Sequence, residues 1–326
     1  MSSPATNASS LLATNGTHPR TALAGLKQNI ARVLFGQQSA IDRVICCLLA
    51  RGHCLIEDVP GVGKTVLATA LSRSVDCSFA RLQLTPDTLP GDLLGVSIYD
   101  KTSGEFVYKR GPIFANIVLA DEINRTPPRT QSALLEAMAE ATVSVDGRVM
   151  ELERPFMVIA TQNPFDFEGT YLLPENQLDR FLMRLSLGYP DAAEEARILH
   201  ERPSNVPLHT LAPVVTKQQL IAMQDEVDRV KVDQTLLQYI VMFANATRKH
   251  DAFLHGLSPR GSLSLAQAAR AHAYYHGRDY VIPEDITQNI EPVCAHRVIL
   301  KNGADTRLDA AGDVLAQIVR SVPSPV

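Results

Sequence analysis

Residues 58–65, DVPGVGKT, have the residue types and spacing of a loop that binds phosphate. Its two glycines let the backbone approach an anion closely, Lys64 can reach terminal phosphates, and the Thr65 hydroxyl can coordinate Mg²⁺. The alternative is a tight turn without a ligand, but a lysine at the positive end of a helix dipole is unfavourable unless an anion offsets it. The segment therefore predicts an anion site at the start of a helix, with Asp58 standing where the usual pattern has a glycine.

A pair of carboxylates follows the apolar, strand-like run 117–120. At the C-terminal end of a parallel strand beside a phosphate loop, Asp121 can hold Mg²⁺ and Glu122 can activate an attacking water. An acidic pair alone is common at strand ends. Together with the lysine and threonine of the loop, it predicts a site for phosphoanhydride hydrolysis.

Polar residues near two further strands extend this candidate site. Asn163 follows the run 157–161 and can bond a γ-phosphate and position water, although Asn-Pro is also ordinary turn chemistry. Arg180 is the preferred cation to neutralise transition-state charge from a neighbouring copy, with Arg184 as the alternative. Arg260 precedes a helix rich in Ala and Leu, where a cation is unfavourable unless it contacts an anion.

Composition describes an ordinary globular protein. The 326 residues are 45% hydrophobic and 20% charged, and this length predicts about two domains. A net charge of −4 and a pI near 6.1 give no global attraction for nucleic acid, so nucleic acid is the less favoured partner.

Cysteine usage and the apolar runs indicate a cytoplasmic protein. The five cysteines lack the spacing of a disulfide framework and are interpreted as buried thiols in a reducing compartment. Residues 1–20 are rich in small polar types and predict a flexible tail. The apolar run 44–56 is interrupted by charge and is too short for a membrane span.

Two domains are expected from the order of the elements. In residues 21–190, apolar strand-like runs alternate with helical patterns, which predicts an α/β domain with a parallel sheet. The expected strands are 53–57, 79–84, 117–120, 156–161 and 185–187.

Beyond residue 190 the patterns are helical only. Residues 191–213 are expected to be a connector, and 214–326 an all-helical domain. The expected helices are 192–201, 217–230, 234–249, 262–276, 283–289 and 309–321.

Two segments interrupt the first domain. Residues 89–111 carry more glycines and polar residues than a crossover needs, and residues 142–152 alternate around Asp146 and Gly147, a pair suited to a hairpin turn. Both are interpreted as insertions on the side of the phosphate loop, the alternative being ordinary surface loops.

Four motifs, taken together, resemble those of one known family. They read LIEDVPGVGKT, ADEINRTPPRTQSALLEAMAE, ATQNPFDFEGTYLLPENQLDRF and GLSPRGSLSLAQAARA. In order and spacing they resemble the MoxR family of AAA+ ATPases, over about residues 34–297. The resemblance implies a P-loop core with a five-stranded parallel sheet, a helical lid and a ring of copies, usually hexameric.

The same resemblance implies roles for individual residues. It makes the loop around Lys64 and Thr65 the Walker A motif and the pair Asp121 and Glu122 the Walker B motif. The insertions would be the helix-2 insert and the pre-sensor-1 hairpin, which face the central pore in relatives. The remaining implied roles are sensor 1 for Asn163, arginine finger for Arg180, sensor 2 for Arg260, flanking of adenine for Gly36 and Gln37, and nucleotide contacts from Gly61, Val62, Gly63 and Val66.

ATP, Mg²⁺ and a client protein are the partners that the resemblance implies. Members of the family act as chaperone-like motors that mature or activate partner complexes, often with a protein that carries a von Willebrand factor A domain. A nucleic-acid motor or loader on the same scaffold is one alternative, with Lys101, Lys109 and Arg110 as its basic residues. A nucleotide-gated binding module with little turnover is another. A GTPase is disfavoured, since no NKxD motif occurs.

Overall fold

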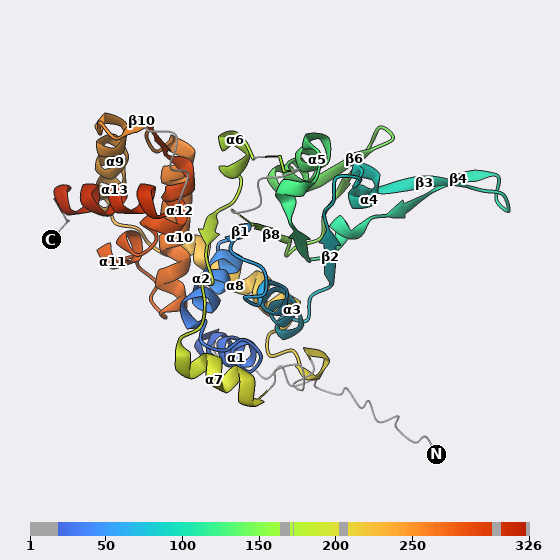
Figure 1. The fold of residues 1–326 in the computed structure, drawn as a ribbon, viewed down its shortest axis with the longest axis horizontal. Coiled ribbons are helices and arrows are strands. Elements are labelled where there is room, and N and C mark those ends of the chain that lie inside the picture. Colours follow the sequence, from blue (N-terminus) through green and yellow to red (C-terminus); the bar gives the residue numbers. More distant parts are fainter. Residues whose placement is uncertain (1–18, 164–169, 172, 202–207, 302–307, 324–326) are drawn as a thin grey trace, which may run out of the picture.

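A five-stranded parallel sheet forms the centre of the molecule in a computed structural model that describes residues 19–163, 170–171, 173–201, 208–301 and 308–323 (Figure 1). The strand order is β2-β5-β8-β1-β9, which confirms the predicted α/β fold. The strands are β1 (Cys54–Glu57), β2 (Phe79–Gln83), β5 (Ile117–Asp121), β8 (Met157–Gln162) and β9 (Met183–Leu185).

The position expected for the last strand, 185–187, was wrong by two residues. Met183 pairs with Cys54 of β1, so the strand starts earlier. It ends at Leu185 because the amides of Leu187 and Gly188 turn to the carboxylate of Asp58.

Alternate residues of each central strand point to opposite faces and join two separate hydrophobic clusters. In β5, Ile117 and Leu119 pack with α1 (Pro19–Ala31), α2 (Gln38–Leu49) and α3 (Lys64–Ser74). Val118 and Ala120 pack on the other face with α4 (Pro90–Leu94) and α5 (Pro128–Glu140). The sheet is therefore covered on both faces, as parallel sheets require.

Both predicted insertions contain antiparallel hairpins. β3 (Gly95–Asp100) pairs with β4 (Glu105–Arg110), and this hairpin projects far from the sheet in Figure 1. β6 (Thr142–Val145) pairs with β7 (Arg148–Glu151) through the expected turn, in which Asp146 and Gly147 have φ of 51° and 73°. The two hairpins are linked, since the Ser97 hydroxyl donates to the Asp146 carboxylate.

The second domain is helical, as predicted, and its described residues add one small two-stranded sheet. β10 (Phe253–His255) pairs antiparallel with β11 (Ile299–Leu300). This sheet connects the segment just before residue 259 to the segment just after residue 297. The helices of the domain are α8 (Lys217–Arg229), α9 (Gln234–Lys249), α10 (Pro259–Tyr275), α11 (Pro283–Thr287), α12 (Ile290–Cys294) and α13 (Leu308–Ser321).

The two domains share one hydrophobic core. Buried residues of the second domain, such as Phe243 and Leu265, belong to the same cluster as Ile41 and Ile45 of α2. Within the segment expected as a connector, α7 (Ala192–Glu201) forms and lies near α1 in Figure 1, away from the other C-terminal helices. The predicted tail lies outside the described residues apart from Pro19 and Arg20, which begin α1.

All five cysteines are free thiols, four of them buried and Cys77 half-buried. Burial raises the pKa of Cys77 to about 11 and that of Cys294 to about 12. Cys77 and Cys294 are therefore protonated near neutral pH and act as packing groups. Among the described residues, no helix combines the length and apolarity needed to cross a membrane.

His53 joins three parts of the core at the start of β1. Its Nε2 bonds the Met138 carbonyl of α5 and its Nδ1 accepts from the Val158 amide of β8, each at 3.0 Å. The ring needs one nitrogen as donor and the other as acceptor, which only the neutral form provides. Burial lowers the pKa of His53 to about 4.

This histidine makes the stability of the fold depend on pH. Below about pH 6.5 the unfolded chain takes up the proton, and the folded protein does not until about pH 4. The free energy of unfolding should therefore fall as the pH is lowered through this window, by about 3 kcal/mol from His53 alone. Urea titrations at several pH values measure this, and the fall should be smaller in His53→Asn. An equal fall in both proteins would contradict this assignment.

Candidate functional site

The predicted phosphate loop connects the end of β1 to the start of α3. Gly61 and Gly63 have φ of 90° and 100°, in the left-handed region that side chains other than glycine rarely adopt. Gly63 is also the N-cap of α3, so the unpaired amides of the first helical turn open into the loop. The local sequence thus folds into a cradle of backbone donors with Lys64 and Thr65 at its base.

Lys64 lies in this loop close to the acidic pair at the end of β5. Its Nζ donates to the Asp58 carbonyl at 2.8 Å. Burial lowers the pKa of Lys64, whereas the negative charges of Asp58, Asp121 and Glu122 oppose this change. The structure therefore brings the lysine of the loop and both carboxylates into one electrostatic environment, as predicted.

Each carboxylate of the acidic pair is held by neighbouring strands. Asp121 accepts from the Thr161 hydroxyl of β8 at 2.6 Å and from Arg81 of β2 at 2.8 Å. Glu122 accepts from Gln83 of β2 at 3.0 Å. Its backbone is left-handed, with φ of 60°, and its amide donates to the same Thr161 hydroxyl at 2.9 Å. The bond to Thr161 thus holds Glu122 in a strained backbone conformation at the position of the second carboxylate.

The candidate site also contains three residues that were not predicted from the sequence: Arg81, Gln83 and Thr161. Gln83 pairs in register with Asp121, because β2 and β5 are parallel neighbours. The available signal was the alternation of polar Arg81 and Gln83 at the end of β2. It becomes informative only when the strand order is known.

The oxygen donors beside the loop fit Mg²⁺. The Thr65 hydroxyl and the Asp121 carboxylate are hard oxygen ligands, and Mg²⁺ usually takes one or two protein ligands plus waters and substrate phosphates. Among the described residues, no group of three or more His, Cys, Asp and Glu side chains could hold a metal ion by itself. The residues present therefore suit a metal that arrives with a phosphate ligand.

Asp58, the residue that departs from the usual loop pattern, fixes the loop to the segment after β9. Its Oδ2 accepts from the Leu187 amide, from the Gly188 amide at 3.0 Å and from the Ser186 hydroxyl at 3.1 Å. Gln37 holds the same segment from the other side, since its Nε2 donates to the Gly188 carbonyl at 3.1 Å. A glycine at position 58 would leave this connection unmade.

A cavity of about 360 Å³ lies next to this connection. Gly36 and Gln37 line it, as do Leu187 and Tyr189 after β9 and Glu291 of the second domain. The two residues expected to flank adenine are thus brought to a space that residues of both domains line.

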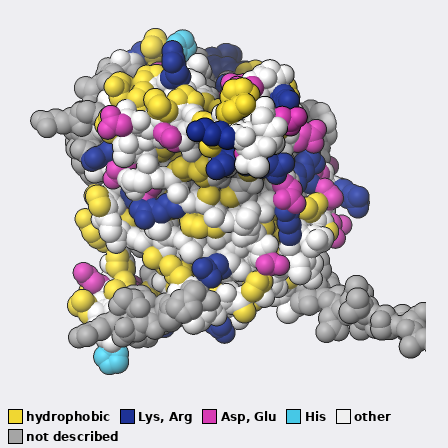
Figure 2. All heavy atoms as spheres, turned by 90° about the vertical axis from the view of Figure 1, so that its right-hand side faces the viewer, with side chains coloured by type: hydrophobic (Ala, Val, Ile, Leu, Met, Phe, Trp, Pro, Cys, Tyr) yellow, Lys and Arg dark blue, Asp and Glu magenta, His cyan; other side chains and the backbone are white. Residues whose placement is uncertain are grey.

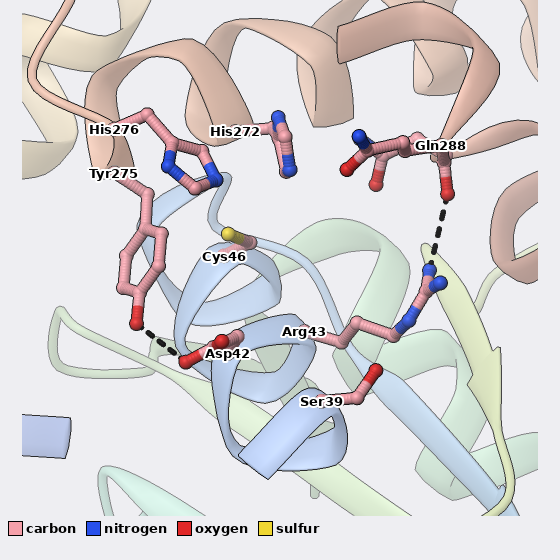
Figure 3. A pocket seen from close by; sticks show the side chains of 9 residues that line it. Ser39, Asp42, Arg43, Cys46, His272, Tyr275, His276 and Gln288 are labelled. Carbon is pink, nitrogen blue, oxygen red and sulfur yellow. Dashed lines mark hydrogen bonds between the residues drawn. The ribbon is translucent and has the colours of Figure 1, made fainter. Parts of the chain in front are cut away.

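A second cavity, of about 320 Å³, borders the first at Ser39 and Arg43 (Figure 3). Here α2 meets the second domain directly: the Tyr275 hydroxyl donates to Asp42 at 2.5 Å, and Arg43 donates to the Gln288 carbonyl at 3.2 Å. These two hydrogen bonds connect α2, which lines both cavities, to α10 and to the end of α11.

Asn163 follows β8 at the same edge of the sheet as the acidic pair, because β5 and β8 are parallel neighbours. Its carbonyl accepts from Asn124 at 3.5 Å. The strand order therefore places Asn163 at the same end of the sheet as Glu122.

Arg184, the alternative to Arg180, is engaged inside the sheet. It lies within β9, is 10% exposed, and donates to the carboxylate of Glu57. Burial lowers the pKa of Arg184 to about 10. Because a buried charge that loses its partner is strongly destabilising, Arg184 is unsuited to reach a neighbouring copy.

Arg180 and Arg260 lie together at the other end of the strands. The Leu182 amide donates to the His53 carbonyl, so Arg180 lies where β1 begins, whereas the phosphate loop lies where β1 ends, about 13 Å away along the strand. Arg180 donates to the Leu135 carbonyl. The Nε of Arg260 lies 3.6 Å from the carboxylate of Asp179. Neither arginine is brought to the phosphate loop of its own chain.

The fold and this site define an AAA+ ATPase module with its lid. Residues 53–183 match the family model described as "ATPase family associated with various cellular activities (AAA)", and residues 245–318 match the AAA lid domain.

Three similar proteins indicate which family of AAA+ ATPases this is. YeaC of Bacillus subtilis (strain 168) is 48% identical, over 92% of this chain and 93% of that protein. Chaperone MoxR1 of Mycobacterium tuberculosis is 39% identical, over 91% of this chain and 80% of that protein. A solved structure from Cytophaga hutchinsonii, described as a candidate ATPase, superposes with a TM-score of 0.86 at 36% identity, covering 94% of this chain and 96% of the other. The chain belongs to the MoxR family of AAA+ ATPases.

Asp58 offers a test of the link between the loop and the segment after β9. Asp58→Asn removes the charge and turns an amide group toward backbone donors, so the free energy of unfolding should fall by about 1–3 kcal/mol. Ser186→Ala removes only the exposed hydroxyl donor and should cost less. Urea unfolding measures both, and an Asp58→Asn protein as stable as the parent would contradict the proposed link.

Proposed function

We propose that the chain hydrolyses ATP with Mg²⁺ at sites shared between neighbouring copies in a ring, expected to be hexameric. The observation that carries this proposal is the separation of the functional groups along β1. Lys64, Asp121 and Glu122 gather at one end of the sheet, and Arg180 and Arg260 at the other. A site that needs both sets must draw them from two copies.

ATP would bind with its phosphates on the loop and its adenine in the cavity lined by Gly36 and Gln37. Lys64 would leave the Asp58 carbonyl and bond the terminal phosphates, with the amides of residues 61–66 around them. Mg²⁺, when bound at Thr65 and Asp121, supplies positive charge to the phosphate oxygens.

Glu122 would accept a proton from water as the water attacks the γ-phosphorus and the bond to the β-phosphate oxygen breaks, which yields ADP and phosphate. Asn163 would align that water. Arg180 of the adjacent copy, together with Arg260, would neutralise the charge that develops on the transferred group. Before ATP binds, Gln83 would hold the Glu122 carboxylate through its side-chain amide.

The work done with ATP is proposed to be chaperone-like remodelling of a partner protein. One observation supports it: the hairpin of β3 and β4 exposes apolar side chains on both of its faces, among them Val96, Ile98, Tyr99 and Phe106, the last 72% exposed. Figure 2 views the molecule from the side on which this hairpin projects and shows hydrophobic side chains among both basic and acidic ones. Exposed apolar area of this kind suits contact with protein.

The base role of Glu122 is tested by Glu122→Gln. ATP hydrolysis should fall at least about 100-fold, because a general base contributes roughly that much or more, while ATP affinity should persist. Steady-state phosphate release and binding of a fluorescent ATP analogue measure the two properties. Glu195→Gln, the same change of charge on the exposed face of α7, is the matched control and should keep the parent rate. Retained turnover in Glu122→Gln would remove Glu122 from this role.

The partner is tested with the same variant as bait. Loaded with ATP, Glu122→Gln should retain a client that Lys64→Ala, which cannot hold the phosphates, does not retain. Capture of a protein with a von Willebrand factor A domain is the expected result. Captured DNA, with an ATPase rate that DNA stimulates, would instead support the nucleic-acid motor.

A further inference from the structure

Arg297, which ends the short turn Ala295–Arg297 after α12, is a lid residue buried against the core segment 179–182. Its side chain is 2% exposed. Its guanidinium donates to the Asp179 carboxylate at 2.7 Å, to the Phe181 carbonyl at 2.7 Å and to the Leu182 carbonyl at 3.1 Å. A buried cation is costly unless such acceptors surround it, so the segment and the arginine need each other.

The same guanidinium is also anchored within the lid. It donates to the Val293 carbonyl and to the Ser264 hydroxyl of α10, the latter at 3.3 Å. Next to it, His296 bonds the Phe181 carbonyl at 3.0 Å. Because a guanidinium is planar and its donors have a fixed geometry, these bonds set one orientation between the lid and the segment.

Arg297 fixes the backbone on both sides of Arg180. The carbonyls of Asp179 and Phe181, which precede and follow Arg180, both accept from Arg297, at 3.3 and 2.7 Å. A residue of the lid therefore helps to hold the backbone that carries Arg180. A shift of the lid would act on this backbone.

Arg297 also contacts the turn that carries Arg260. A Cβ at Gly261 would lie 3.2 Å from the Arg297 Cδ, so the first turn of α10 packs on the arginine stem. The Asp179 carboxylate lies between the two guanidinium groups, 2.7 Å from the Arg297 Nε and 3.6 Å from the Arg260 Nε. One buried arginine thus touches the segments that bear both candidate trans-acting cations.

We propose that Arg297 is a positioning residue for the ATPase site of the adjacent copy: it holds the 179–182 segment against the lid so that Arg180 and Arg260 are presented together. The inference rests on the proposed function, in which these arginines act across an interface. Arg297 itself touches no nucleotide.

Mixed assemblies separate this role from a merely structural one. Arg297→Lys keeps the charge but not the planar set of donors, so the ATPase rate of the assembled protein should fall roughly 10- to 100-fold, with ATP affinity unchanged. Lys64→Ala is inactive in its own loop but keeps its arginines. Because a head-to-tail interface joins two different surfaces, an equal mixture should regain about one quarter of the parent rate.

The controls separate the two proposals. Arg180→Ala mixed with Lys64→Ala tests the shared site alone and should regain activity in the same way. Arg278→Lys alters a lid arginine that also bonds a buried carboxylate, Asp285, and should lower the melting temperature without lowering the ATPase rate below that temperature.

Three outcomes would overturn the inference. If Arg297→Lys keeps the ATPase rate of the parent protein, the 179–182 segment does not depend on Arg297 for its position. No gain in the Arg297→Lys mixture, with a gain in the Arg180→Ala mixture, would reject the positioning role and leave the shared site intact. No gain in either mixture, or no ATPase activity in the parent, would reject the shared site as well.

Discussion

The parallel pairing of β1 with β8 on one side and with β9 on the other sets the positions of the functional groups of the candidate site. Parallel strands end at the same edge, so the loop after β1 lies with the polar residues that end β5 and β8. The same pairing places the segment before β9 at the opposite edge. Since β1 has only four residues, this short strand keeps two chemically different sets of side chains apart.

Asp58 and Gln37 extend this constraint toward the lid. Both bond Gly188, where the chain leaves the sheet: Asp58 accepts from its amide, and Gln37 donates to its carbonyl. The Asp58 carbonyl meanwhile accepts from Lys64. A phosphate that draws Lys64 away from the Asp58 carbonyl would therefore act on Asp58, whose carboxylate holds the segment that follows β9. The unusual acid in the loop therefore joins the phosphate site to the chain segment after β9.

The lid contacts the core at both edges of the sheet. Near the phosphate loop, Tyr275 and Gln288 bond residues of α2, beside the cavities. At the other edge, Arg297 bonds the segment before β9. A single packed body thus spans the two ends of the sheet, and the hydrophobic core is continuous between the domains. This arrangement gives the proposed site of one copy a physical connection to the site of the next.

The elements that could be predicted from the sequence are those with local signals. Gly61, Gly63 and Lys64 indicate the loop wherever they stand, because a left-handed backbone and a cation at a helix start are local requirements. The apolar runs ending in Asp121 and Asn163 likewise predicted strands, and Asp146 with Gly147 predicted the turn of a hairpin. Which of these residues come into contact depends on how the strands and the lid pack together. Gln83 reaches Glu122 because β2 lies beside β5, Arg184 is buried because β9 lies beside β1, and Arg297 reaches Asp179 because the lid folds back on the core. These contacts join residues far apart in the chain, and a hydrogen bond across such a distance leaves no periodicity in the sequence.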